Sequence, residues 1–72
     1  MKLHEAMQLI LEENDRPMTA RELADEINKR ELYSRTDKKP LPTNQIGARA
    51  RQYPQLFEKE EIDGRIHFLL RV

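Results

Sequence analysis

The sequence predicts a small α+β domain, mainly helical, in which three helices are followed by a C-terminal β-hairpin. Three observations support this fold class. Apolar residues recur with helical spacing in the first half, a capping box begins a second helix at Thr19, and Asp63-Gly64 divides two stretches of strand-like alternation. With 72 residues and no cysteine, we expect residues 1–72 to form one domain without disulfides or cysteine-bound zinc.

A first helix is predicted from Leu3 to Asn14. Its apolar residues follow the i, i+3, i+4, i+7, i+8 pattern of one helical stripe, and they are Leu3, Ala6, Met7, Ile10 and Leu11. The Asp15-Arg16-Pro17 sequence ends it.

A second helix is predicted from Ala20 to Arg30. Thr19 and Glu22 have the spacing of a capping box, and Met18 and Leu23 have that of a hydrophobic staple. Leu23, Ala24 and Ile27 are its expected buried residues.

A long polar loop, from Leu32 to Pro42, separates this helix from a third at residues 43–53. Thr43 is the expected N-cap, and Pro54 disfavours helical geometry in the residue before it. Ile46, Ala50 and Tyr53 share one face, which we expect to be buried.

The Asp63-Gly64 pair predicts a type I′ hairpin turn, because that turn needs positive φ at both central residues. A two-residue turn pairs Ile62 with Arg65 and, further out, Lys59 with Phe68. One face of the hairpin is expected to cover the helices with four apolar residues, Phe57, Ile66, Phe68 and Leu70. A short extended piece at Pro17-Met18 is positioned to add a third strand.

Three helices followed by a terminal hairpin is the order of a winged helix-turn-helix. In that arrangement the third helix is the recognition helix and the Phe57–Arg71 hairpin is the wing. The loop before the third helix is longer than the usual turn of the motif.

Short motifs along most of the chain also resemble one family. They are Glu5-Ala6, Pro17-Met18-Thr19, Glu31-Leu32-Tyr33, Lys39-Pro40, Thr43, the 45–49 stretch, Tyr53, Leu56-Phe57-Glu58, Gly64 and Leu69. These residues resemble the HARE-HTH domain, a winged helix of restriction-modification and DNA-repair proteins, chromatin-associated Asx-like proteins and the delta subunit of bacterial RNA polymerase. The bacterial members are the most similar. The resemblance implies a DNA-binding adaptor without catalysis of its own, acting in transcription regulation or restriction-modification beside a protein partner or fusion domain.

The charge is neutral in total but uneven along the chain. Residues 1–34 carry five basic and eight acidic side chains, whereas residues 35–57 carry five basic side chains and a single acidic one, Asp37. The positive charge therefore collects on the loop and the third helix, which are the parts that a winged helix presents to DNA.

The third helix offers a polar outer face for double-stranded DNA. Asn and Gln can pair with adenine and Arg with guanine, while basic and hydroxyl side chains ahead of the helix suit phosphates. The expected base-reading residues are Asn44, Gln45, Arg49, Arg51 and Gln52, around the small Ala48. The expected phosphate-binding residues are Arg35, Lys38, Lys39 and Thr43, with Arg65 at the tip of the wing.

Two alternatives stay open at this point. A polar outer face is also typical of a surface helix that is merely solvated. The wing carries Glu58, Glu60, Glu61 and Asp63 against Lys59 and Arg65, which disfavours phosphate and favours a protein partner.

No constellation for catalysis, metal or cofactor binding is recognisable, and no small-molecule substrate is expected. No apolar run is longer than that at residues 68–70, which is far short of a bilayer span of about 20 residues. We therefore expect a non-enzymatic protein of the bacterial cytoplasm, associated with the nucleoid if it binds DNA.

Overall fold

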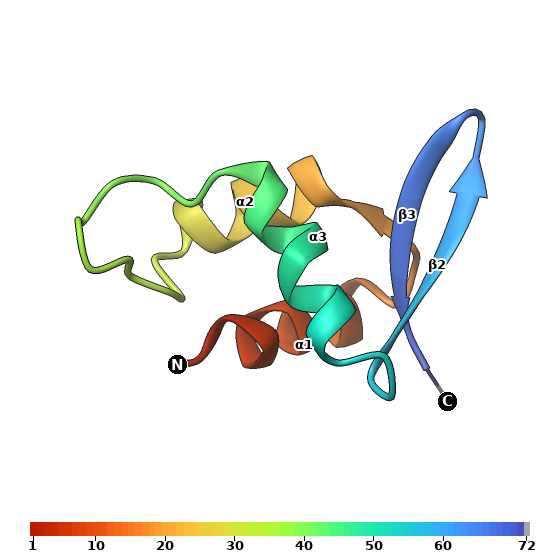
Figure 1. The fold of residues 1–72 in the computed structure, drawn as a ribbon, viewed down its shortest axis with the longest axis horizontal. Coiled ribbons are helices and arrows are strands. Elements are labelled where there is room, and N and C mark those ends of the chain that lie inside the picture. The colour runs from red at the N-terminus through yellow and green to blue at the C-terminus, as the bar shows by residue number, and fades with distance from the viewer. Residues whose placement is uncertain (72) are drawn as a thin grey trace.

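Three helices and a three-stranded antiparallel sheet follow one another in the predicted order in the computed structural model, which describes residues 1–71 (Figure 1). The elements are α1 (Leu3–Asn14), β1 (Met18–Thr19), α2 (Ala20–Lys29), α3 (Thr43–Gln52), β2 (Phe57–Ile62) and β3 (Arg65–Leu70). This is a winged helix-turn-helix fold, as the sequence predicted, and the predicted third strand is present as β1.

The first two helices begin and end where local chemistry requires. Asp15 takes a left-handed φ of 50° after α1 and donates its N–H to the Leu11 carbonyl. The capping box of α2 is confirmed, because the Glu22 N–H donates to the Thr19 hydroxyl at 3.1 Å and the Thr19 N–H donates to the Glu22 carboxylate at 2.9 Å. The helix ends at Lys29, one residue earlier than predicted, and Arg30 is its C-cap.

The predicted N-cap of α3 is wrong. Pro42 is the N-cap, in extended conformation, and its carbonyl accepts from the Gln45 N–H at 3.2 Å. Thr43 is already helical, so its hydroxyl is not the capping group. Tyr53 lies just outside the helix as its C-cap, with a φ of −127°, because the following Pro54 disfavours helical geometry there.

The sheet has the strand order β1-β3-β2, and the predicted hairpin register is confirmed. Ile62 pairs with Arg65 and Lys59 with Phe68, and both turn residues, Asp63 and Gly64, have positive φ. β1 pairs with the other edge of β3. The hairpin is thereby attached to the start of α2.

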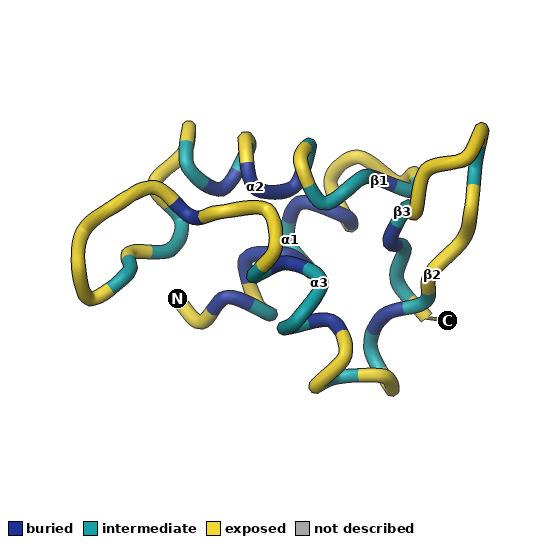
Figure 2. The backbone as a smooth tube through the Cα atoms, turned by 45° about the horizontal axis from the view of Figure 1, so that its top comes forward, coloured by how far each residue is buried: buried dark blue, intermediate teal, exposed yellow. Residues whose placement is uncertain are grey.

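The core lies between the three helices and the base of the hairpin, as the buried stretches in Figure 2 show. The expectation that Ile66 covers the helices is wrong, because this residue is 49% exposed. It shares a sheet face with Phe57 and Phe68 but lies near the turn, where the hairpin extends past the helices. The polar loop contributes a buried residue that the sequence pattern did not reveal, Leu41.

Candidate nucleic-acid interface

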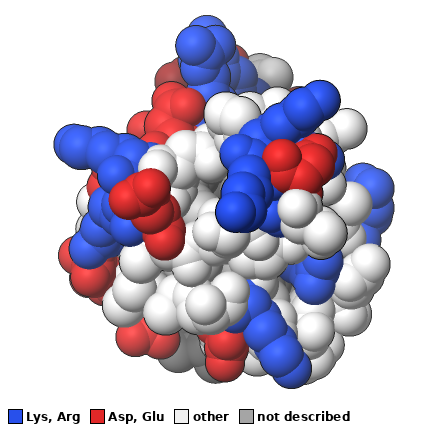
Figure 3. All heavy atoms as spheres, turned by 90° about the vertical axis from the view of Figure 1, so that its left-hand side faces the viewer, with Lys and Arg blue, Asp and Glu red and all other residues white. Residues whose placement is uncertain are grey.

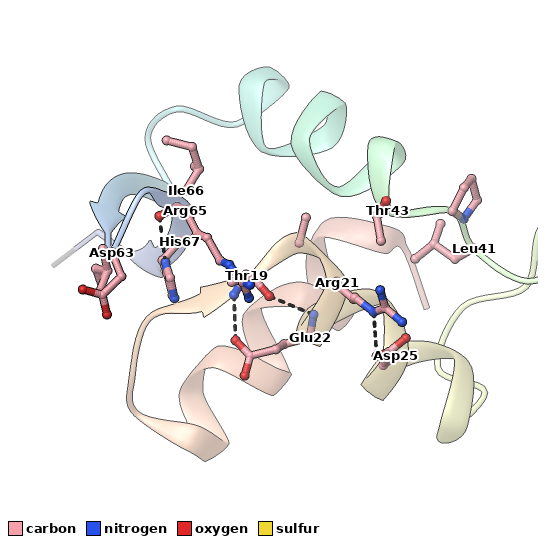
Figure 4. A pocket seen from close by; sticks show the side chains of 13 residues that line it. Thr19, Arg21, Glu22, Asp25, Leu41, Thr43, Asp63, Arg65, Ile66 and His67 are labelled. Carbon is pink, nitrogen blue, oxygen red and sulfur yellow. Dashed lines mark hydrogen bonds and ion pairs between the residues drawn. The ribbon is translucent and has the colours of Figure 1, made fainter.

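The beginnings of α2 and α3 and the tip of the wing lie at one side of the molecule, at the top of Figure 1. Between them is an open hollow of about 1110 Å³. Figure 4 shows it surrounded by side chains from all three parts, including Arg21 of α2, Thr43 of α3 and Arg65 of the wing. The fold therefore brings the start of α3 close to the wing tip.

The outer face of α3 is open to solvent. Ile46 and Ala50 are buried on the inner face, and this turns the predicted base-reading residues outward or to the sides. Asn44, Arg51 and Gln52 are exposed, while Gln45, Ala48 and Arg49 are half-buried. A Cβ added at Gly47 would meet no atom within 4 Å, so Gly47 and Ala48 leave a shallow stretch of helix surface.

The loop between α2 and α3 is held by hydrogen bonds to α2 and by others within the loop. The Asn28 side chain donates to the Leu41 carbonyl at 3.1 Å and accepts from the Leu41 N–H at 2.8 Å. Near the tip, the Lys38 N–H donates to the Arg35 carbonyl at 3.0 Å and the Lys39 N–H to the Asp37 carboxylate at 3.1 Å. Lys38 and Lys39 are exposed at this tip, so the loop presents them from an ordered backbone.

Arg35 has a different role from the two lysines. Its guanidinium forms an ion pair with Asp37 at 3.2 Å and reaches the Pro40 carbonyl at 3.5 Å. It therefore stabilises the loop, and less of its hydrogen-bonding capacity is left for a phosphate.

Most basic residues of the candidate interface are not engaged in ion pairs. Among residues 1–71, the side chains of Lys38, Lys39, Arg49, Arg51 and Arg65 form no ion pair, and the same is true of Lys2, Lys29 and Lys59 elsewhere. Figure 3, which views the molecule from the loop side, shows the basic side chains in separate groups, several of them beside acidic ones. The interface thus offers a few separate positive charges and not one broad patch.

The wing is acidic, although less so than its sequence implies. The Glu58 carboxylate accepts from the Arg71 guanidinium at 2.9 Å, and this pair neutralises one of its charges. Glu60, Glu61 and Asp63 are exposed, as is Arg65 beside the turn. Phosphate would meet three carboxylates near the wing tip that form no ion pair within residues 1–71.

Two basic residues near the interface were missed by the sequence reasoning. Arg21 lies in the first turn of α2 with a side chain 84% exposed, and it is 3.9 Å from Asp25. Lys59 lies at the base of the wing and lines a hollow together with Arg51. The predicted hairpin register placed Lys59 opposite Phe68, on the face of the sheet that packs on the helices. Lys59 could therefore have been identified as a polar residue on that face.

Aromatic residues near the interface serve the fold. The Tyr53 ring stacks on His4, with ring centroids 4.1 Å apart and an interplanar angle of 20°, and this joins the end of α3 to α1. Tyr33 is half-buried against the core. Neither ring stands exposed as a platform for stacking bases.

The carboxylates with lowered pKa values are engaged in structural contacts. The Arg30 guanidinium donates to Glu13 at 2.6 and 3.1 Å and lowers the pKa of that carboxyl. The N–H of Thr19 lowers the pKa of Glu22.

Within residues 1–71, no three His, Asp or Glu side chains gather as a set of metal ligands. Among the same residues, no helix has the length and apolar character of a membrane span.

Comparison with known proteins gives one match. The HARE-HTH family model, described as a helix-turn-helix (HTH) domain of ASXL and restriction endonuclease proteins, matches residues 1–59. The match covers the three helices, the loop and the base of the wing. Neither a curated protein nor a solved structure matches the chain.

Proposed function

Because the chain belongs to the HARE-HTH family, whose winged helices generally bind DNA and are not catalytic, we propose that it binds double-stranded DNA through α3 and the loop before it. The observation that carries the proposal is how many of this segment's cations are unpaired. Of its basic side chains, Lys38, Lys39, Arg49 and Arg51 form no ion pair among residues 1–71, and Arg35 forms one. Unpaired cations gain most from a polyanion, because each phosphate contact releases counterions without breaking an internal ion pair.

The outer face of α3 supplies the base contacts. Asn44, Gln45 and Gln52 suit adenine, while Arg49 and Arg51 suit guanine. The shallow surface at Ala48 allows the helix backbone to approach the floor of the major groove.

The loop supplies the phosphate contacts. Lys38, Lys39 and the Thr43 hydroxyl bind the DNA backbone, and Arg35 adds its charge while holding the loop in shape. Arg65 at the wing tip is left out of this set, because the exposed carboxylates of Glu60, Glu61 and Asp63 lie on the same part of the wing.

Such a module acts as a targeting or regulatory domain in transcription or restriction-modification. It works in the bacterial cytoplasm on nucleoid DNA, beside a protein partner or fusion domain. With few phosphate contacts available, we expect weak binding that falls with salt, by a modest slope set by the number of those contacts.

A titration of isotope-labelled protein with a short mixed-sequence duplex tests the proposal by NMR. Amide shifts should concentrate at residues 38–52 and shrink as salt is added. Arg51→Ala and Arg49→Ala should each weaken binding by about 1–3 kcal/mol if the arginine reads a base. Arg16→Ala is the matched control, because Arg16 is paired with Glu22 at 3.4 Å on the opposite half of the chain. The proposal is wrong if both α3 variants bind like the parent.

A second candidate function is docking of a protein partner through the acidic surface. The exposed, unpaired carboxylates of Glu60 and Glu61 favour it. Reversing both to lysine should abolish retention of such a partner on a column that carries the protein. The same double variant should bind duplex DNA at least as tightly as the parent if DNA is the ligand.

A further inference from the structure

Positive charge lies ahead of α3 and beside its C-terminal end. The loop hollow, of about 400 Å³, precedes the helix and is lined by Arg35, Lys38 and Lys39 together with Glu31. The second hollow, of about 370 Å³, is lined by Arg51 and Lys59 where the helix ends and the wing begins. Glu58 also lines it, and its carboxylate is already paired with Arg71. The lining side chains that the structure describes are therefore net positive in both hollows.

The hollow between the wing tip and the start of α3 is different. Arg21 and Arg65 line it together with Glu22, Asp25 and Asp63, as Figure 4 shows. Asp25 is paired with Arg21 and Glu22 with Arg16, so Arg65 and Asp63 remain as one charge of each sign. Glu60 and Glu61 add two exposed acidic side chains on the strand that leads to the tip. The sign of the charge thus changes between the base of the wing and its tip.

The length of α3 fits the spacing of the two DNA strands. Its 10 residues span about 15 Å at a rise of about 1.5 Å per residue, and the major groove is about 12 Å wide. A helix that crosses this groove brings its two ends to the two rims. The loop lysines ahead of one end of α3 and Lys59 beside the other end then face different phosphate strands.

We infer that α3 crosses the major groove from rim to rim, with Lys38 and Lys39 on one phosphate strand and Lys59 on the other, while the tip of the wing stays off the DNA. This inference rests on the proposed function. It assigns a phosphate contact to Lys59 and removes Arg65 from the interface. The wing contributes its base, which holds Lys59 beside the end of α3.

Two single substitutions on the same hairpin test the inference. Lys59→Ala and Arg65→Ala each remove one exposed cation without an ion pair among residues 1–71. Affinity for a short duplex is measured over a range of salt concentrations by fluorescence anisotropy. Lys59→Ala should weaken binding about fivefold to tenfold at 0.1 M salt and reduce the slope of log K against log salt by about 0.9, the value of one phosphate contact. Arg65→Ala should change neither quantity.

The opposite pattern, in which Arg65→Ala weakens binding and Lys59→Ala does not, would show that the wing tip contacts DNA and would overturn the inference. Equal losses in both variants, or no loss in either, would overturn it as well. A parent protein that binds no duplex even at low salt would overturn the proposed function itself. The two failures are therefore distinguishable.

Duplexes with uncharged methylphosphonate linkages on one strand provide a second readout. Neutralising the strand near the loop should remove the effect of Lys38→Ala and Lys39→Ala and leave that of Lys59→Ala. Neutralising the other strand should do the reverse. If all three substitutions respond to the same strand, α3 does not cross the groove.

Discussion

The α1–α2 side of the molecule and the loop–α3 side differ in how their charges are used. Each arginine on the α1–α2 side has a carboxylate partner, and the pairs are Arg16–Glu22 at 3.4 Å, Arg21–Asp25 at 3.9 Å and Arg30–Glu13 at 2.6 Å. On the loop–α3 side only Arg35 is paired, with Asp37. Lys38, Lys39, Arg49 and Arg51 have no such partner among residues 1–71. The two lysines of the α1–α2 side, Lys2 and Lys29, are also unpaired there, so the contrast between the sides is one of arginines.

This difference distinguishes charges that serve the fold from charges available to a ligand. Exposed ion pairs add little to stability, so the pairing on the α1–α2 side matters mainly because it occupies those cations. The unpaired cations of the loop and α3 are solvated and can exchange water and counterions for phosphate. Substitutions on the first side should therefore change stability without changing DNA affinity, and substitutions on the second side should do the reverse.

The largest expected effect concerns Asn28, which joins the two sides. Asn28→Ala leaves the N–H and carbonyl of Leu41 without their partner, and it should lower the free energy of unfolding by about 2 kcal/mol. Duplex affinity should fall too, because the loop lysines lose their fixed position. Urea unfolding and a DNA titration measure the two quantities.

Asn14→Ala is the matched control for Asn28. The Asn14 side chain donates a single hydrogen bond, to the Ile10 carbonyl at 2.8 Å, at the exposed end of α1. Its loss should cost less stability and leave affinity unchanged. Equal effects of the two substitutions on affinity would mean that the loop does not position the DNA contacts.

Two threonines provide a sharper comparison with an intermediate effect. Thr19→Ala removes the capping box of α2 and should lower the free energy of unfolding by about 1 kcal/mol with no change in duplex affinity. Thr43→Ala removes a hydroxyl that caps nothing, so it should leave stability nearly unchanged and weaken binding. Denaturant titration measures the free energy of unfolding of both variants, and fluorescence anisotropy measures their affinity for the duplex. A loss of stability in Thr43→Ala as large as that in Thr19→Ala would contradict the division between the two sides.

The fold was predictable wherever a local pattern determines it. Helical spacing predicted α1 to the residue, and the Asp63-Gly64 turn determined the register of the hairpin. The errors arose where the outcome depends on neighbours. Ile66 has the right alternation but lies beyond the helices, and Thr43 is a good capping residue that follows a proline already in the capping position.

The candidate site was predictable as a region but not as a set of free charges. Counting charges located the basic segment, because that needs only the sequence. Pairing depends on side chains brought together by the fold, as when Arg35 bonds Asp37 and Pro40. The predicted register placed Lys59 on the same sheet face as Phe68, but its position beside the end of α3 depends on how the hairpin packs against the helix.

The smallest expected effect concerns the pH dependence of stability on the α1–α2 side. Hydrogen bonds from Arg30 and from the Thr19 N–H lower the pKa values of Glu13 and Glu22 below their ordinary value of 4.5. Because the folded pKa values are the lower ones, these carboxylates stabilise the fold above about pH 4.5, and the contribution is lost as the pH falls through them.

Thermal unfolding between about pH 5 and about pH 3 measures this contribution. The parent should lose stability over the range, and the double variant Glu13→Gln with Glu22→Gln should lose less, because its side chains no longer bind a proton on unfolding. Glu60→Gln with Glu61→Gln makes the same change of charge on the unpaired wing and should follow the parent. A curve flattened equally by both double variants would show that acid sensitivity comes from total charge, and the contrast between paired and unpaired carboxylates would then have no bearing on stability.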